Sequence, residues 1–399
     1  MQPLFTLPLT PVRISAIAWA IARVLTSAVT LALMVGSGSA TAQHLNFPHG
    51  EFPLTDSSRR SIEFSEILSG GPMRDGIPPI DKPTFVSPEE ANDWLAEDEP
   101  VIALTIGEET RAYPLQILMF HEIVNDTLAD IPVAVTFCPL CNATIVFERN
   151  VDGQRLDFGT TGRLRRSDLV MYDRQSESWW QQFTGRGIVG EYTDVVLERR
   201  PSSIVAWRTV RNAFPDVEVL SRETGFGRSY GSNPYRGYDR IDSEPFLFDS
   251  PTDPRLPPME RVLALPGEPA SRLITLSRLS DEPVINIDID GRPVTVFAAT
   301  NALSALDQAA IADSRAIPAA AGFDRRVDGR TLTFTVESNP DDDTLMVHDE
   351  QTGSRWDPFG RAIDGELTGK SLDVIDLGVH FAFAWFAFEP QAEVLQDPE

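Results

Sequence analysis

The sequence predicts a β-rich α+β fold made of two tandem, related halves, with few helices and a long irregular segment between the halves. Two observations lead to this prediction. An internal repeat aligns FERNVDGQRLDF (147–158) with FDRRVDGRTLTF (323–334), with seven identities in twelve positions. Apolar residues alternate along VIALTI (101–106) and VINIDI (284–289), as they do in half-buried strands. Because repetition at one offset is typical of a duplicated module, we expect both halves to share one topology.

The composition is that of an acidic protein with a packed core. The 399 residues include 59 acidic and 34 basic side chains, a formal net charge of −25. This balance argues against non-specific nucleic-acid binding, which requires clustered Lys and Arg. Hydrophobic residues make up 42% of the chain, enough to form a core and to exclude wholesale disorder.

Residues 1–42 are predicted to be a signal peptide. They contain no Asp or Glu, and an apolar stretch, VLTSAVTLALMV, follows Arg23. Ala40-Thr41-Ala42 fits the small-residue pattern of a signal-peptidase site, so the mature chain would begin at Gln43. We therefore expect a periplasmic or secreted protein with no stable membrane insertion after cleavage. An uncleaved N-terminal anchor is the alternative.

The remaining chain divides into four segments at changes in composition and at the limits of the repeat. Ser87-Pro88-Glu89-Glu90 is typical of a helix start, and Pro114 precedes a second predicted helix, LQILMFHEIV. A Gly-, Pro-, Arg- and Tyr-rich stretch separates the two copies. The predicted segments are an N-terminal extension with short helices (43–99), copy one (100–220), an irregular connection (221–282) and copy two (283–392).

The two cysteines of the chain, Cys138 and Cys141, form a Cys-Pro-Leu-Cys motif between two predicted strands. Pro139 fixes one backbone dihedral, and Asn142 tolerates the left-handed conformation after the second thiol. Such a turn lets both sulfurs face one ion. His121, the one histidine of copy one, is the candidate third ligand. These ligand types predict a transition-metal site for zinc, copper or iron.

Two alternatives to a metal site stay open for the cysteines on the sequence alone. An exported protein with a single Cys pair often has a disulfide, which would leave a non-enzymatic ligand-binding module. A thiol-disulfide oxidoreductase is the other alternative, although no long helix follows the first Cys to lower its pKa. His121 also lies on an apolar face with Ile117, Phe120 and Val124, where a histidine can be a plain core residue. Whether the protein is an enzyme stays undecided.

Two further stretches, 159–185 and 227–239, concentrate polar and aromatic side chains. Such loops line small-molecule pockets when Arg binds anionic groups and Tyr provides flat contacts. Asp173 and Trp180 recur in copy two as Asp349 and Trp356, which favours a structural role for them. The ligand-binding candidates are Arg163, Asp168, Asp173, Arg228, Tyr230, Tyr235 and Tyr238.

Four ordered motifs carry a resemblance to a known family. RAYPLQILMFHEIVND, VAVTFCPLCNATIVF, TTGRLRRSDLVMYDRQSESWWQQFTG and GRSYGSNPYRGYD resemble the uncharacterised family named domain of unknown function 3179. The resemblance implies an exported protein with no established activity, and the chain has Glu389 where the family tail more often has His. The residues that fall on the family's motif positions are His121, Cys138, Cys141, Asp168, Asp173 and Tyr230.

Overall fold

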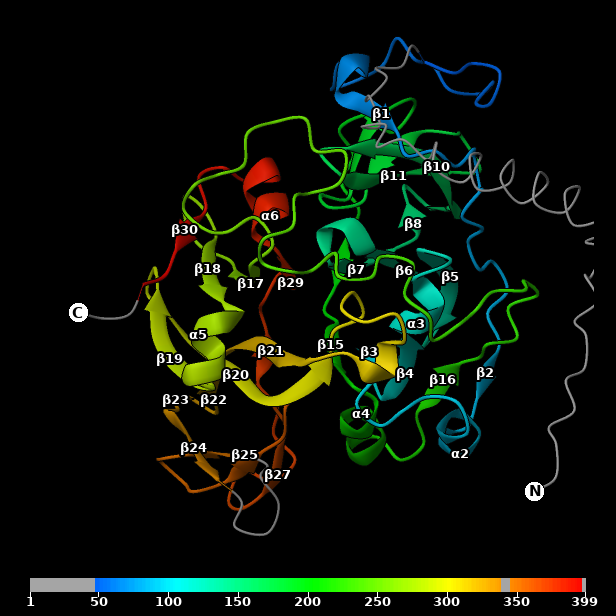
Figure 1. The fold of residues 1–399 in the computed structure, drawn as a ribbon. Helices are drawn as coiled ribbons and strands as arrows, with labels where there is room; N and C mark the ends of the chain where they lie inside the picture. Colours follow the sequence, from blue (N-terminus) through cyan, green and yellow to red (C-terminus); the bar gives the residue numbers. More distant parts are fainter. Residues whose placement is uncertain (1–46, 339–344, 397–399) are drawn as a thin grey trace, which may run out of the picture. The chain divides into compact units, whose positions relative to one another are not determined.

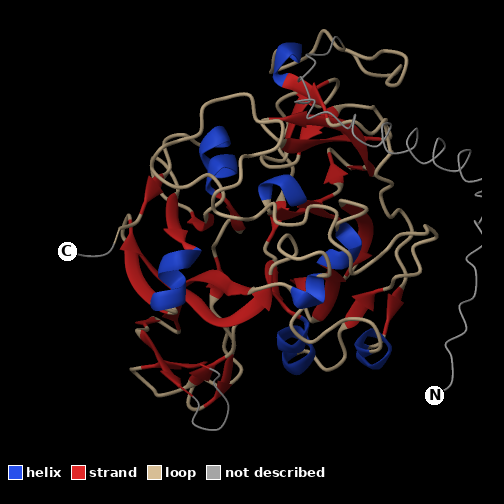
Figure 2. Cartoon of the chain, viewed as in Figure 1, coloured by secondary structure: helices blue, strands red, loops and turns tan. Residues whose placement is uncertain are grey.

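Short β-strands dominate the secondary structure, as the sequence predicts (Figure 1, Figure 2). The computed structural model describes residues 47–338 and 345–396. Five α-helices lie in this described part of the chain. The predicted signal peptide and its cleavage site lie outside the described residues.

Three sheets and one small hairpin form the first half of the described chain. The first sheet has, in spatial order, β15 (Ser203–Ala206), β3 (Pro100–Ile106), β4 (Glu109–Pro114), β16 (Glu218–Leu220) and β2 (Phe85–Val86). The second has β14 (Arg199–Arg200), β7 (Ala143–Glu148), β6 (Ile131–Cys138) and β5 (Ile123–Leu128). The third has β1 (Ile67–Ser69), β10 (Phe158–Arg165), β11 (Asp168–Asp173), β12 (Trp179–Gln181) and β13 (Arg186–Val189), and the hairpin pairs β8 (Asn150–Val151) with β9 (Gln154–Arg155).

The second half also contains three sheets and one small hairpin. The first sheet has β29 (Val379–Phe381), β17 (Arg261–Leu265), β18 (Arg272–Thr275) and β30 (Glu393–Val394). The second has β19 (Val284–Ile289), β20 (Arg292–Leu303), β21 (Ala316–Asp324) and β28 (Asp373–Val374). The third has β24 (Phe334–Ser338), β25 (Leu345–Asp349), β26 (Arg355–Trp356) and β27 (Ala362–Asp364), and the hairpin pairs β22 (Arg326–Val327) with β23 (Arg330–Thr331).

The strand order of the two halves corresponds sheet by sheet. The order β15-β3-β4-β16 in the first half matches β29-β17-β18-β30 in the second, and β16 and β30 both pair in parallel with their neighbours. Residues 261–275 therefore take the place of residues 100–114. The two alternating stretches 101–106 and 284–289 are not equivalent strands, because β19 and β20 take the place of β5 and β6.

The irregular segment between the halves is shorter than predicted. No helix or strand lies in residues 221–260, whereas residues 261–282 contain β17, β18 and α5 rather than loop. Asp239 is at the end of the Tyr-rich loop (residues 227–239). Its buried carboxylate forms ion pairs with Arg261 and Arg315 of the second half. These ion pairs fix the loop against the strands that follow it.

An asparagine joins two sheets in the same way in each half, buried in the first half and half-buried in the second. The Asn125 side chain donates to the carbonyl of Phe158 and accepts from its N–H, at 2.8 and 2.9 Å. Asn286 makes the same two bonds with Phe334, also at 2.8 and 2.9 Å. Because an amide side chain that satisfies both backbone groups of one residue fixes register, these contacts hold equivalent strands in equivalent positions.

One predicted helix start is confirmed and one predicted helix is much shorter than expected. Ser87 caps α2 and exchanges hydrogen bonds with Glu90, a capping box. The helix predicted after Pro114 ends at Leu118, because the β-branched Ile123 and Val124 pair with β6. The helices are α2 (Pro88–Asn92), α3 (Leu115–Leu118), α4 (Trp207–Ala213), α5 (Leu276–Asp281) and α6 (Ala382–Phe388), with 3-10 turns η1 (Phe64–Glu66), η2 (Pro139–Cys141) and η3 (Ile311–Asp313).

Candidate metal site

The Cys-Pro-Leu-Cys motif forms the predicted tight turn between two strands. Cys138 is the last residue of β6, and η2 follows with Pro139 at its first position. Asn142 then adopts the left-handed conformation, with φ 49° and ψ 36°, before β7 begins. Both thiols are buried in the core of the first half.

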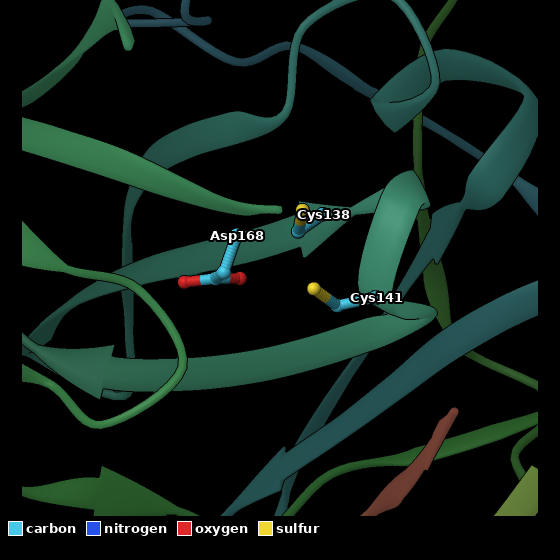
Figure 3. A group of neighbouring side chains, drawn as sticks. All are labelled: Cys138, Cys141 and Asp168. Carbon is cyan, nitrogen blue, oxygen red and sulfur yellow. The ribbon is translucent and has the colours of Figure 1, made fainter. Parts of the chain in front are cut away.

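Asp168 brings a carboxylate to this turn from the neighbouring sheet. It is the first residue of β11, and the turn before it places Arg166 and Ser167 at positive φ. One Asp168 oxygen and the two sulfur atoms all lie within 4.8 Å of one another (Figure 3). The Ser167 carbonyl oxygen is 3.6 Å from the Cys141 sulfur and 4.0 Å from that of Cys138.

Hydrogen bonds hold one oxygen of the Asp168 carboxylate and leave the other without a partner. Oδ2 accepts from the Gln181 side chain at 2.6 Å and from the Phe183 N–H at 2.9 Å. Oδ1 is buried and has no hydrogen-bond partner among the described residues. Because an unpaired buried polar atom is costly, either a bound cation or a proton from the neighbouring Cys138 and Cys141 thiols would stabilise this oxygen.

Burial favours the protonated, neutral forms of the carboxyl and thiol groups at this site, and a bound cation would favour their charged forms instead. Burial raises the pKa of Asp168 to about 7. Burial raises the pKa of Cys138 and raises that of Cys141 further, since the other thiol and Asp168 lie close to it. Burial, followed by the nearby Asp168, raises the pKa of Glu122 to about 8. The Arg199 guanidinium interacts electrostatically with Asp168 but forms no ion pair with it.

The cysteines are free thiols in this structure. The structural disulfide that the sequence left open is therefore not formed here, and the sulfurs are available as ligands. A turn with two unlinked thiols beside a carboxylate can hold a metal ion through two sulfurs and one oxygen.

Comparison with known proteins supports the sequence resemblance. Residues 74–392 match the family described as "Protein of unknown function (DUF3179)". The chain belongs to this family. No curated protein and no solved structure matches it. The family assignment thus covers both halves of this DUF3179 protein and leaves its chemistry to be inferred from the site.

His121 is not part of the group formed by Asp168 and the two cysteines. Its Nδ1 lies 2.6 Å from the Pro78 carbonyl oxygen and its Nε2 lies 2.7 Å from the Tyr230 hydroxyl. Of the predicted Cys-Cys-His set, the structure brings together the two cysteines, with Asp168 rather than His121 as the third potential ligand. The physical reason is that α3 ends early, so His121 is in the turn before β5 rather than on a helix packed against the cysteines.

Part of the Tyr-rich loop of this DUF3179 protein, residues 227–239, lies close to the cysteine turn. The Tyr238 hydroxyl donates to the Leu140 carbonyl within the cysteine turn at 3.1 Å. Burial raises the pKa of Tyr235, as does the nearby Glu122. Tyr230 binds His121 instead, and Arg228 is exposed. The loop thus contributes Tyr235 and Tyr238 to the surroundings of the thiols.

The other two ligand-binding candidates make structural contacts. Arg163 is buried and forms a two-point ion pair with Glu51, at 2.9 and 2.6 Å. Asp173 accepts the indole N–H of Trp180 at 2.9 Å, and Asp349 accepts that of Trp356 at 3.0 Å. We expected both residues to be ligand-binding candidates, but their polar atoms are engaged within the protein.

Sequence reasoning missed the acidic residue beside His121. Glu122 is buried, and its φ of 58° is unusual for a residue other than glycine. A carboxylate next to an apolar helix pattern, directly before the β-branched pair Ile123-Val124, is the one signal that the sequence offers. Among the described residues, no helix is long and apolar enough to span a membrane.

Proposed function

We propose that this DUF3179 protein binds a transition-metal cation through Cys138, Cys141 and Asp168. The observation that carries the proposal is the buried, unpartnered Asp168 oxygen beside two free thiols. Burying several acidic groups together is unfavourable unless a cation or protons neutralise them. A metal ion would satisfy the free oxygen and both sulfurs at once.

The donor atoms limit the kinds of metal that fit. Thiolates bind zinc, copper and iron, whereas calcium and magnesium take oxygen ligands only. Two sulfurs and one oxygen leave a fourth position of a tetrahedral site for another ligand or a substrate. The proposed cofactor is therefore zinc, iron or copper.

Thiol-disulfide exchange is supported less well than metal binding. A reactive thiol needs a lowered pKa, and burial raises the pKa of both Cys138 and Cys141. The residues after Cys141 form a strand, so no helix N-terminus stabilises a thiolate. A redox-cycling pair would also require solvent access, and the exposed fractions of the two cysteines are 1% and 0%.

We also propose that the two halves arose by duplication and that one half supports the other. The matching strand order and the paired Asn125 and Asn286 contacts support this proposal. Cysteines occur in the first half alone, so the site belongs to that half. The test is to compare the two halves within distant members of the family. If the halves resemble each other no more in sequence and strand order than unrelated β-sheets do, the proposed duplication is contradicted.

The proposal is tested on mature protein recovered from the periplasm or medium after expression with residues 1–42 present. Mass spectrometry should show Gln43 as the first residue, the expected result for an exported chain. Elemental analysis of the same sample should show about one zinc, iron or copper per chain. Two thiols should titrate after denaturation with a chelator, without reduction. A metal-free sample, even after incubation with each metal, would contradict the metal-binding proposal.

The pH dependence of the metal-free protein gives a second expected result. The pKa of Asp168 is raised in the folded state, so the folded protein holds a proton there that the unfolded chain releases. Its contribution to stability is complete below the unfolded pKa and is lost as the pH rises toward about 7. The wild type should therefore lose stability relative to Asp168→Asn between about pH 4 and about pH 7.

Urea unfolding at several pH values, with a chelator present, measures this difference. Added zinc should reverse the trend in the wild type, because metal binds the deprotonated ligands. Parallel pH curves for the wild type and Asp168→Asn would show that the carboxyl does not titrate in this window.

A further inference from the structure

We infer that Glu122 is the fourth ligand of the site and that the site selects a borderline divalent cation such as Zn²⁺ over Cu⁺. This inference rests on the proposed metal-binding function and names the class of metal that the site takes. It assigns a role to a residue that is outside the group of Asp168 and the two cysteines.

The backbone places Glu122 beside the strand that carries the first thiol. The Phe137 N–H donates to the Glu122 carbonyl oxygen at 2.8 Å, and Phe137 directly precedes Cys138. Ile123 pairs with Thr136 in the same ladder. Glu122 therefore extends the β5–β6 pairing at the end where the cysteine turn begins.

The Glu122 backbone adopts a conformation that side chains other than glycine rarely take. Its φ is 58°, and its N–H donates to the Leu118 carbonyl at 2.7 Å, closing the turn after α3. A left-handed residue with a side chain is unfavourable, and such residues cluster at functional sites. Here the conformation keeps a buried carboxylate at the turn.

No hydrogen bond or ion pair reaches the Glu122 carboxylate from the described residues, and the exposed fraction of the residue is only 7%. Glu99 is buried to a similar extent, yet its carboxylate accepts from Gln116 at 2.7 Å and from the Ala96 N–H at 3.2 Å. Glu122 also interacts electrostatically with two members of the site. Asp168 helps to raise the pKa of Glu122, and Glu122 helps to raise the pKa of Cys138.

Glu122 is also the member of the site that solvent reaches. Cys141 and Asp168 have exposed fractions of 0% and Cys138 has 1%, compared with 7% for Glu122. In the proposed site, the carboxylate of this most exposed member completes four ligands around the ion.

Two thiolates and two carboxylates favour a borderline divalent ion. Zn²⁺ accepts both sulfur and oxygen ligands in a tetrahedral site, and four anionic ligands offset its charge. Cu⁺ prefers soft sulfur ligands and gains little from a carboxylate. Loss of Glu122 should therefore weaken zinc binding and leave copper binding almost unchanged.

The test compares wild type, Glu122→Gln and Glu99→Gln for Zn²⁺ and Cu⁺ affinity, each by competition with a chromophoric chelator. We expect Glu122→Gln to lower Zn²⁺ affinity at least ~10-fold, because removal of a second-shell partner alone costs ~10–100-fold. Cu⁺ affinity should change by less than ~3-fold, a small difference on this scale. Glu99→Gln removes a buried carboxylate outside the site and should change neither affinity.

The outcomes distinguish the proposed metal-binding function, the role of Glu122 as a ligand and the preference for Zn²⁺. A wild type that binds neither metal overturns the proposed function and this inference together. A wild type that binds Zn²⁺ while Glu122→Gln binds it equally tightly overturns the inference alone. Equal losses of Zn²⁺ and Cu⁺ affinity overturn the selectivity claim. Thermal unfolding with a chelator present establishes that the variants are folded, and Glu122→Asp, which keeps the charge, should retain part of the Zn²⁺ affinity.

Discussion

Replacing Cys141 by serine is expected to remove bound metal from the protein. The sulfur is fully buried beside Asp168, so no other thiol or solvent ligand can take its position without movement of the turn. A lost thiolate should lower Zn²⁺ affinity by more than the ~10–100-fold of an outer-shell change. Elemental analysis of the purified variant should give zinc at background level, and a chelator competition should give the affinity.

His121→Gln is the matched comparison for this variant. His121 is equally buried and lies in the same half, but its ring nitrogens are engaged with Pro78 and Tyr230. The variant should keep its metal while losing about 1–3 kcal/mol of stability from the broken hydrogen bonds. Zinc retained in Cys141→Ser would remove Cys141 from the ligand set, and zinc lost in His121→Gln would return the histidine to it.

The sequence predicts the cysteine turn well, because its geometry is encoded locally. Pro139 and the left-handed Asn142 determine a turn of this kind wherever it occurs. The two thiols therefore come together irrespective of the rest of the fold. The third ligand depends instead on which strands neighbour the turn, and a single sequence carries no direct signal for sheet order.

The error over His121 has a specific cause. Apolar residues spaced as on a helix continue past Leu118, but Ile123 and Val124 gain more from pairing with β6. Tertiary pairing thus overrides the helical period at this point. Asp168 was among the ligand candidates, yet its approach to Cys138 requires β11 to follow a turn with two residues at positive φ.

The register of the two halves was predicted correctly only downstream of the cysteine turn. β6 ends at Cys138 and β7 begins at Ala143, whereas β20 ends at Leu303 and β21 begins at Ala316. The second half therefore has a longer connection where the first half has the cysteine turn. Upstream of this connection, equivalent strands are therefore closer in residue number than they are downstream, so 284–289 corresponds to β5 and not to 101–106.

Asp239→Ala is expected to be the most destabilising single change in the connection between the halves. The Asp239 side chain is fully buried and accepts from Arg261 at 2.9 Å, from Arg315 at 2.7 Å and from Ser304. Arg261 has an exposed fraction of 5%, so removal of the carboxylate leaves a buried guanidinium unpaired. Breaking one partner of a buried pair costs about 3–5 kcal/mol. The free energy of unfolding, measured in urea with m held to the wild-type value, gives the loss.

Asp242→Asn on the same loop is the control for this variant. Asp242 and its partner Arg240 are both exposed, so solvent screens their ion pair and its loss should leave the stability almost unchanged. The pH dependence of the free energy of unfolding should also differ between Asp239→Ala and Asp242→Asn. Burial raises the pKa of Asp239, but Arg261, Ser304 and Arg315 outweigh it and hold the pKa below the usual range. Its contribution is therefore present above the unfolded pKa and is lost as the pH falls, so the gap between wild type and Asp239→Ala should narrow in acid. A gap that stays constant down to the acid transition would mean that the loss comes from packing rather than from the charge of Asp239.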